Sequence, residues 1–376
     1  HKATGTADIG FCNMAKVLYF TKTRLPEVWA RCRHSLFYGP FFSYQMTGKM
    51  GLEPTFPGNH TYLWDYRKGG FSDVARQLNG DVLFSQPMMK SWDVLGAVTP
   101  EFAAQCGLPA DCVVTPGIHD SNANFLPYMA KGHKDFLLNS TGTWCVLMRN
   151  SETLELTDEE IAAKVFFNQN ALGGPVRTSL MTSGLDYDTF SSFTDVPDQS
   201  DFDAVRQVLA EKNLFVVPGV MPNATAFPGT PAQIIDGDKV YLAADLQKDG
   251  GKPMTAHGQK YRAALNIGLA LASAKMLGYC GLGKGAQVFT EGGFAKNAPY
   301  CRLLAALRPE QRFALTSVKE GTAFGAGITA WMAATGKGLE EIGAEFEIES
   351  RDVPREDFAD LEAYKAAFEA RVAAAR

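Results

Sequence analysis

The fold class is decided by residues 286–318, which read AQVFTEGGFAKNAPYCRLLAALRPEQRFALTSV. The run at residues 286–290 predicts a β-strand, and the glycine-containing stretch 291–297 that follows predicts a turn. A helix through Leu307 then leads to a second predicted strand at residues 312–318. Strands that alternate with helices along a chain are typical of an α/β domain, and we predict that class here.

The neighbouring segments extend this pattern in both directions. Apolar residues at helical spacing predict a helix over 259–278, and a segment rich in small residues predicts another over 322–334. Upstream, two apolar runs within residues 135–148 flank the small polar turn Ser-Thr-Gly-Thr at 140–143, which predicts a β-hairpin with this tip. The acidic, alanine-rich segment 356–376 predicts one amphipathic helix.

The first third of the chain is less regular. Residues 14–49 have helical periodicity with a break at Pro26, and the Thr-Gly-Lys at 47–49 is a helix-stop signature. Residues 53–100 are rich in proline, glycine and tryptophan and predict irregular structure. The β-branched run and Pro-Gly pair at 113–117 predict a strand that ends in a tight turn and leads into a helix.

Composition excludes several classes of protein. A length of 376 residues predicts two or three domains of ~150 residues each. Lys and Arg total 36 against 41 Asp and Glu, a net charge of -5, which gives no general attraction to nucleic acid or to anionic lipid. No apolar run approaches the ~20 residues that span a bilayer, and no signal-peptide pattern is present. We therefore expect a cytoplasmic enzyme without nucleic-acid or membrane partners.

Four familiar motifs are incomplete or missing. Residues 278–284 have the spacing of a phosphate-binding Walker A loop, but Gly285 stands where a magnesium-binding Ser or Thr is required. The Gly-Ala-Gly at 325–327 approximates a dinucleotide fingerprint but lies inside a predicted helix, where close packing through small residues is the better interpretation. The seven cysteines form no CxxC pair, and the dispersed histidines show no ligand spacing, so no metal site is expected.

Asp120 is the most informative carboxylate in the chain. It follows a predicted strand and glycine turn, where a side chain can project from a sheet edge into a cleft, and polar residues flank it: His119, Ser121, Asn122 and Asn124. The alternative is that Asp120 only caps the following helix by accepting a hydrogen bond from its first turn. These residues alone leave both interpretations open.

Two further stretches could hold a phosphorylated ligand. The hairpin tip at 140–143 presents small hydroxyl residues around a glycine, which can hold phosphate oxygens, although any polar hairpin turn could look the same. Gly292 and Gly293 follow a strand, with Lys296 and Asn297 one turn on, so a ligand could approach the backbone closely there. A purely structural strand-to-helix turn is the alternative.

Taken in order, these stretches resemble the FGGY carbohydrate kinases, and most of all the rhamnulokinase and fuculokinase branch. The resemblance runs over most of the chain and is weakest over 150–255. It rests on five stretches: Pro26 through the Thr-Gly-Lys turn at 47–49, Gly-Ile-His-Asp-Ser at 117–121, Ser-Thr-Gly-Thr-Trp at 140–144, Gly-Gly to Asn at 292–297, and Glu-Gly-Thr-Ala-Phe-Gly-Ala at 320–326. The His-Asp pair followed by the Thr-Gly-Thr-Trp turn is its most specific part.

The resemblance implies a role for each matching residue. Asp120 would be the catalytic base that takes a proton from a sugar hydroxyl, with His119 and Ser121 in contact with the sugar. The residues implied to bind ATP are Gly142 and Thr143 in a phosphate loop, and Gly292, Gly293 and Asn297 toward the adenine end. Phe294 stands where the family usually has a small residue, which predicts a reshaped nucleotide pocket.

The resemblance also implies a two-lobed, actin-like ATPase fold of the ribonuclease H-like type. Residues 1–130 would be the remainder of the N-terminal sugar-binding lobe and residues 131–376 the C-terminal nucleotide-binding lobe. The family's first phosphate loop, an Asp-x-Gly-Thr hairpin, has no counterpart here. We therefore expect an incomplete N-terminal lobe, with His1 marking where a longer kinase was cut.

The implied reaction is transfer of the γ-phosphoryl group of ATP, with Mg²⁺, to a primary hydroxyl of a ketose. A 6-deoxyketohexulose such as L-rhamnulose or L-fuculose is the first expectation and a pentulose the second. Partners would be a small-molecule sugar and ATP, and a homodimer is left open. Two alternatives remain at this point, a non-catalytic sugar- or nucleotide-binding protein that keeps the fold, and an actin-like ATPase without a sugar substrate.

Overall fold

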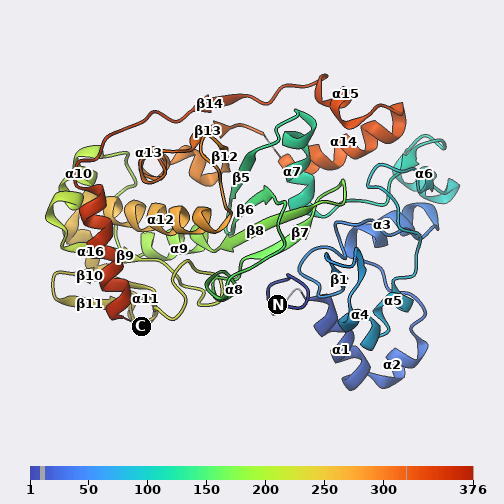
Figure 1. Ribbon diagram of the computed structural model, residues 1–376, viewed down its shortest axis with the longest axis horizontal. Helices are drawn as coiled ribbons and strands as arrows, with labels where there is room; N and C mark the ends of the chain where they lie inside the picture. Colours follow the sequence, from blue (N-terminus) through green and yellow to red (C-terminus); the bar gives the residue numbers. More distant parts are fainter. Residues whose placement is uncertain (9–12, 319, 376) are drawn as a thin grey trace.

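The computed structural model describes residues 1–8, 13–318 and 320–375, and its central element is a mixed seven-stranded sheet (Figure 1). The strand order is β14-β13-β12-β5-β6-β8-β7. β5 and β13 pair with β12 in parallel, and the other pairs are antiparallel. The strands span Phe136–Thr141 (β5), Cys145–Asn150 (β6), Phe166–Gln169 (β7), Pro175–Met181 (β8), Gln287–Gly292 (β12), Arg312–Thr316 (β13) and Ser350–Asp352 (β14).

The α/β pattern predicted from residues 286–318 is confirmed. β12 is followed by the 3-10 turn η2 (Gly293–Lys296), the helix α13 (Ala298–Leu307) and then β13. The predicted hairpin over 135–148 is also confirmed, because β5 and β6 pair antiparallel with Thr141 opposite Cys145.

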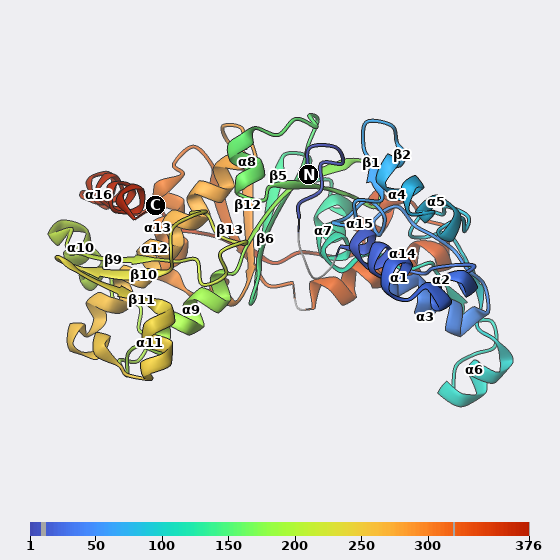
Figure 2. The same cartoon turned by 90° about the horizontal axis from the view of Figure 1, so that it is seen from below.

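Helices cover both faces of the sheet (Figure 2). Successive side chains of a strand point to opposite faces, so Leu138 packs with Phe125 and Tyr128 of α7 (Asp120–Ala130), while Leu137 packs in the cluster formed by α12 (Gln259–Tyr279). α14 (Gly321–Thr335) and α15 (Leu339–Gly343) lie on the α7 side, and α9 (Ser183–Ser191) and α13 lie on the α12 side. The predicted helix over 259–278 is confirmed with one further residue.

α7 and α14 are in close contact, which explains the first glycine of the Gly-Ala-Gly stretch at 325–327. A Cβ atom on Gly325 would overlap the backbone carbonyl oxygen of Ala123, and one on Gly321 would overlap the side-chain oxygen of Asn124. The small residues therefore let the two helices approach, as predicted, and do not form a nucleotide loop.

A smaller antiparallel sheet, in the order β11 (Lys239–Leu242), β10 (Gln233–Asp236) and β9 (Leu214–Val217), packs against α12 through β9. The C-terminal helix α16 packs there, and the buried hydroxyl of Tyr364 donates to the backbone oxygen of Leu214 at 2.7 Å. The predicted helix over 356–376 is thus confirmed in a shorter form, and Arg376 lies outside the described residues. The remaining elements of this half are α8 (Asp158–Ala162), α10 (Phe202–Glu211), α11 (Ala243–Asp249), η1 (Pro253–His257) and α16 (Leu361–Ala374).

The N-terminal third forms a separate layer of short elements beside α7 and α14 (Figure 1). The break at Pro26 separates two helices as predicted, and Gly48 ends a third with a left-handed φ of 69°. These elements are α1 (Met14–Arg24), α2 (Pro26–Arg31), α3 (Tyr38–Thr47), β1 (Trp64–Asp65), β2 (Gly70–Phe71), α4 (Asp73–Gln77), α5 (Gly80–Leu83), β3 (Gly96–Ala97), α6 (Pro100–Cys106) and β4 (Val113–Val114). They enclose a small apolar cluster of their own.

Two absences concern only the described part of the chain. None of its helices is long and apolar enough to cross a bilayer. Its six cysteines are free, and the seventh, Cys12, lies outside the described residues.

Candidate active site

Asp120 is the first residue of α7 and follows β4 and a glycine turn, as the sequence predicted. The turn requires glycine because Gly117 has φ 97° and lies against the backbone of Gly39. The helix N-cap is His119. Asp120 is therefore not the N-cap, although its side chain does accept a hydrogen bond from the first turn of the helix as that alternative expected. The side chain, 73% exposed, projects from the helix start.

The carboxylate of Asp120 is held by one of its two oxygens. Oδ1 lies 2.6 Å from the backbone nitrogen of Ser121, 3.3 Å from the Ser121 hydroxyl and 3.0 Å from His119 Nδ1. The hydrogen bond from His119 is the main cause that holds the pKa of Asp120 well below its usual range. Oδ2 has no partner within the described ranges, so an anionic oxygen is left available beside a helix N-terminus.

Side chains of α7 join Asp120's helix to the carboxyl ends of two parallel strands. Asn124, one turn after Asp120, donates to the hydroxyl of Ser140 at 3.0 Å and also to Glu291, the residue before the two glycines. The hydroxyl of Tyr128 donates to the other oxygen of Glu291 at 3.0 Å. Burial raises the pKa of Glu291, and these donors counteract the shift. The carboxyl ends of parallel strands are where α/β folds bind ligands.

Four of the five residues implied to bind ATP line one pocket of about 350 Å³, namely Gly142, Thr143, Gly293 and Asn297. The hairpin tip at 140–143 and the turn at 291–297 thus meet at one pocket. The other lining residues are Gly184, Tyr187, Asp188, Asp198, Phe294 and Lys296. Gly292 directly precedes Gly293 and is not part of the lining.

The backbone of this pocket needs glycine at two positions. Gly292 has φ 82°, and a Cβ atom there would overlap the carbonyl oxygen of Thr141. The Thr141 hydroxyl accepts from the nitrogen of Phe294 at 3.0 Å and donates to the carbonyl oxygen of Glu291, which fastens the strand end to the turn. A Cβ on Gly184 would similarly overlap the carbonyl oxygen of Gly142. The main chain therefore defines the shape of the pocket.

Two residues that line this pocket, Asn297 and Phe294, also make contacts that stabilise the fold. The side chain of Asn297 caps α13 by accepting from the nitrogen of Tyr300 at 3.1 Å and donates to Asn266 at 2.7 Å. Phe294 is buried, with its ring 4.6 Å from that of Tyr300 and 5.8 Å from that of Tyr187. The larger residue at 294 thus supplies an aromatic wall.

The sequence missed several residues of this region. Gly184, Tyr187, Asp188 and Asp198 come from the segment 150–255, whose pattern gave no functional signal. A glycine at the first turn of a helix directly after a buried strand was the one available clue to Gly184. Glu291 lies inside a recognised motif, but its burial against α7 depends on tertiary contacts.

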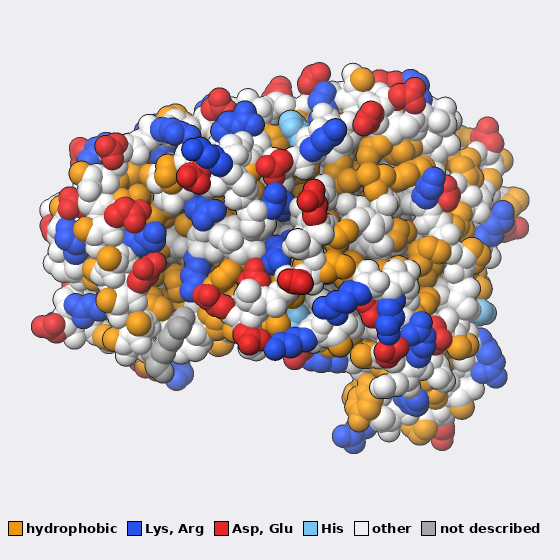
Figure 3. Space-filling view, viewed as in Figure 1, with side chains coloured by type: hydrophobic (Ala, Val, Ile, Leu, Met, Phe, Trp, Pro, Cys, Tyr) orange, Lys and Arg blue, Asp and Glu red, His pale blue; other side chains and the backbone are white. Residues whose placement is uncertain are grey.

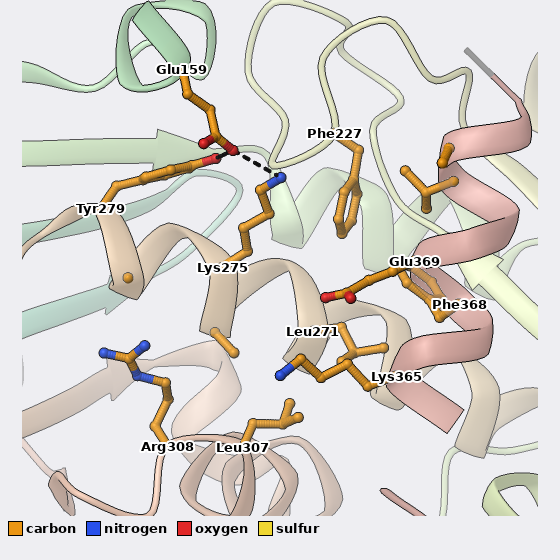
Figure 4. Close-up of a pocket in the computed structure, with 14 residues that line it drawn as sticks. Glu159, Phe227, Leu271, Lys275, Tyr279, Leu307, Arg308, Lys365, Phe368 and Glu369 are labelled. Atoms are coloured by element: carbon orange, nitrogen blue, oxygen red, sulfur yellow. Dashed lines mark hydrogen bonds and ion pairs between the residues drawn. The ribbon is translucent and has the colours of Figure 1, made fainter. Parts of the chain in front are cut away.

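A second hollow, of about 480 Å³, lies between α12, α16 and the segment after α13 (Figure 4). Lys275 makes an ion pair with Glu159 at 3.5 Å. The other residues that line this hollow include both apolar and charged side chains. None of the predicted site residues lies there. On the face shown in Figure 3, acidic and basic side chains are interspersed, which agrees with the modest net charge of -5.

Metal chemistry must be considered because nucleotide kinases use Mg²⁺. The described ranges contain no group of three His, Cys, Asp or Glu side chains that could hold an ion. Mg²⁺ commonly keeps several waters and binds through substrate phosphates and one or two carboxylates. Asp188 and Asp198 are the carboxylates that line the pocket, and they are the residues that could hold an ion arriving with a nucleotide.

Comparison with known proteins decides the family. Residues 133–338, more than half of the chain, match the family described as "Carbohydrate kinase FGGY, C-terminal domain". The chain belongs to the FGGY carbohydrate kinase family. It is accordingly a phosphotransferase with a mixed α/β, actin-like ATPase fold, and that prediction is confirmed.

Solved structures of FGGY kinases share this fold. The carbohydrate kinase from Novosphingobium aromaticivorans matches with a TM-score of 0.76 and 24% identity over 99% of this chain and 75% of that one. The xylulose kinase from Rhodospirillum rubrum matches with a TM-score of 0.73 and 18% sequence identity, and the match covers 99% of this chain and 73% of that one. The glycerol kinase from Plasmodium falciparum, solved with ADP, matches with a TM-score of 0.70 and 14% sequence identity, and the match covers 100% of this chain and 74% of that one. The FGGY family is thus established for this chain, whereas the rhamnulokinase and fuculokinase branch stays a prediction.

Proposed function

We propose that this FGGY kinase transfers the γ-phosphoryl group of ATP to a primary hydroxyl of a ketose, with Asp120 as the catalytic base. The observation that carries the proposal is the geometry of Asp120. Its Oδ1 is held by His119 and Ser121, its Oδ2 is free, and its helix is joined through Asn124 to the strand ends that border the pocket.

A carboxylate with a low pKa suits phosphoryl transfer. The transition state is loose, so the hydroxyl proton leaves late and the enzyme mainly needs to orient the acceptor. Asp120 stays anionic at neutral pH and can accept a hydrogen bond from the sugar hydroxyl through Oδ2. Ser121 would contact the sugar through its hydroxyl, and His119, whose ring nitrogens face Asp120 and Asn59, would contact it through a ring carbon.

ATP would lie with its phosphates toward the hairpin tip, at Gly142 and Thr143, and its adenine toward the turn at 292–297. The exposed main chain at both stretches can approach the ligand, and the rings of Phe294 and Tyr187 supply an apolar wall for a base. Mg²⁺ would neutralise charge on the phosphates, and Lys296 adds a positive charge at the pocket.

For the acceptor, the resemblance favours a 6-deoxyketohexulose such as L-rhamnulose or L-fuculose, with a pentulose as the second candidate. Several proteins of similar structure are named xylulose kinases, which supports the second candidate. The division into lobes at residues 130 and 131 is part of the same proposal.

The test is ADP release from MgATP by the full-length protein with a panel of ketoses that includes both classes. We expect stimulation by one class, and Asp120→Asn should lower kcat with it by about 10²–10⁴-fold while ATP binding is kept. Asp111→Asn, an exposed carboxylate in the same segment, is the matched control. Near-normal turnover by Asp120→Asn would refute the role of Asp120.

A further inference from the structure

Asp120 is held through His119, and His119 is held by a polar network from the irregular segment at 53–59. We propose that Asn59 is a positioning residue for phosphoryl transfer, because its side-chain amide fixes the tautomer of His119 that donates to Asp120. The inference rests on the proposed function of Asp120 as the base. It concerns a residue from the part of the chain that gave no functional signal in the sequence.

The orientation of the Asn59 amide is determined by its neighbours. The backbone N–H of His60 lies 2.9 Å from Asn59 Oδ1, and an N–H group can only donate, so this end of the amide must be the oxygen. The other end, Nδ2, then faces Nε2 of His119 at 2.6 Å. Asn59 is only 2% exposed, so water does not compete for either contact.

This orientation decides which ring nitrogen of His119 carries the proton. An amide NH₂ can only donate, so Nε2 must accept, and in a neutral imidazole the proton is then on Nδ1. Nδ1 lies 3.0 Å from Asp120 Oδ1 and can donate to it. The opposite tautomer would place two N–H groups against each other at Asn59 and a lone pair against a carboxylate oxygen at Asp120.

A proton on Nδ1 of His119 also determines which of two nearby atoms accepts the hydrogen bond from the backbone N–H of Ser121. Its backbone N–H lies 3.3 Å from His119 Nδ1 but 2.6 Å from Asp120 Oδ1. Because Nδ1 carries a proton, this N–H donates to the carboxylate. Asp120 Oδ1 thus receives N–H donors from both neighbours, and Oδ2 remains the oxygen that a hydroxyl can reach.

The segment at 53–59 also holds the backbone of His119. The His119 N–H donates to the hydroxyl of Thr55 at 2.9 Å, and Thr55 in turn donates to the buried carboxylate of Glu53. Glu53 also accepts from the Ser91 hydroxyl at 2.7 Å. With its backbone and ring both fixed, the His119 side chain, 17% exposed, has little freedom to turn away from Asp120.

The first test measures the tautomer directly in the unaltered protein. Long-range ¹H–¹⁵N NMR of protein labelled with ¹⁵N-histidine distinguishes an Nδ1–H from an Nε2–H ring, and comparison with His119→Gln assigns the signals. We expect His119 to be an Nδ1–H tautomer at neutral pH. An Nε2–H tautomer would overturn the proposal, whatever the variants do.

The second test replaces the amide and measures kinetics. Asn59→Ala should lower kcat by about 10–100-fold with the KM for ATP within about 2-fold, because the nucleotide pocket is not touched. Asn59→Asp, whose carboxylate accepts a hydrogen bond, should draw a proton to Nε2 and change the ¹⁵N pattern of His119. Asn13→Ala is the matched control, since Asn13 is a buried helix cap of the same layer, distant in sequence from this network.

The outcomes separate this inference from the proposed function. If Asp120→Asn is inactive but Asn59→Ala loses no more activity than Asn13→Ala, the positioning role of Asn59 is wrong, while the role of Asp120 as catalytic base is still supported. If Asp120→Asn is active, the proposed function itself fails. A fall in kcat for Asn59→Ala accompanied by an unchanged His119 tautomer would also overturn the inference, because the loss would then be only structural.

Discussion

The two sides of the candidate active site are built in different ways. The nucleotide pocket is shaped by main chain, since glycines at 184 and 292 allow backbone segments to touch and Thr141 fastens them. The side around Asp120 is shaped by buried polar side chains that reach it from residues 53–59. The first kind of construction depends on local conformation, and the second depends on contacts between distant segments.

This difference predicts different responses to mutation. On the nucleotide side, a change that moves the main chain should abolish ATP binding, whereas removal of single side chains should matter less. On the side of Asp120, conservative changes of polar groups should alter turnover or pH behaviour while ATP binding is preserved.

The largest effect is expected for Gly292→Ala. The added Cβ would overlap the Thr141 carbonyl oxygen, and alanine at φ 82° is itself strained. Backbone strain of about 1–3 kcal/mol and overpacking of about 1–3 kcal/mol give a loss of about 2–6 kcal/mol in the free energy of unfolding. Chemical denaturation and ATP titration should show this loss together with a loss of ATP binding.

Gly293→Ala is the matched control for that prediction. A Cβ on Gly293 would be 3.8 Å from its nearest neighbour, Thr141 O, and its φ is not in the left-handed region. We expect nearly unchanged stability and at most a modest change in ATP affinity. Equal effects of the two substitutions would contradict a pocket defined by close backbone contact at Gly292.

The next effect concerns the pH dependence of stability through Glu53. Burial raises the pKa of this carboxyl from 4.5 to about 7. The folded state then binds more protons than the unfolded state between these values, so stability falls as pH rises through this window. The contribution is about 3 kcal/mol, at 1.36 kcal/mol per pKa unit.

Glu53→Gln should remove this slope, because glutamine does not titrate. The measurement is the free energy of unfolding from urea titrations between pH 4.5 and 8, compared with the unaltered protein. Burial also lowers the pKa of His60 to about 4 and raises that of Asp186 to about 6, and these slopes cancel in the comparison. Parallel curves for the two proteins would show that Glu53 does not titrate in this range.

The contrast between the two sides also explains what could be predicted from the sequence. The turn at 292–293 and the 140–143 tip can be found because a turn between apolar runs is a local signal, and the structure brings Gly142, Thr143 and Gly293 to one pocket. Asn59 and Glu53 lie in a stretch without periodicity, so nothing local marks them as partners of His119. Asp120 could be found from the sequence because it follows a strand and a glycine turn. The residues at 53–59 that hold His119 beside it could not be found, because their contacts depend on the folded structure.

A smaller effect on stability is expected at Asn124, which connects the helix that carries Asp120 to the strand ends beside the nucleotide pocket. Asn124→Ala removes the donor to Ser140 and to the buried Glu291, which keeps its hydrogen bonds with the Tyr128 and Ser140 side chains. A buried carboxylate that loses a donor costs about 2 kcal/mol, and kcat should fall as well because α7 carries Asp120. Ser140→Ala removes the hydroxyl that accepts from Asn124 and also hydrogen-bonds to Glu291, and it leaves Asn124 as a donor to Glu291, so it should cost about 1 kcal/mol. Equal losses in thermal unfolding would show that the direct bond from Asn124 to Glu291 is not the more important one.

The smallest effect is expected for Ser121→Ala, which tests how the side of Asp120 meets the sugar. The Ser121 hydroxyl is the most distant of the three donors to Oδ1, at 3.3 Å, and the closer backbone N–H of the same residue stays in place. The base should therefore keep its position, and kcat should stay within about 3-fold. If the hydroxyl also contacts the ketose, the KM for the ketose should rise about 5-fold, close to 1 kcal/mol, while the KM for ATP is unchanged. Ser121→Thr, which retains a hydroxyl, should restore the KM. A fall in kcat as large as that of Asp120→Asn would instead mean that Ser121 holds the base and that the main-chain donor is not sufficient.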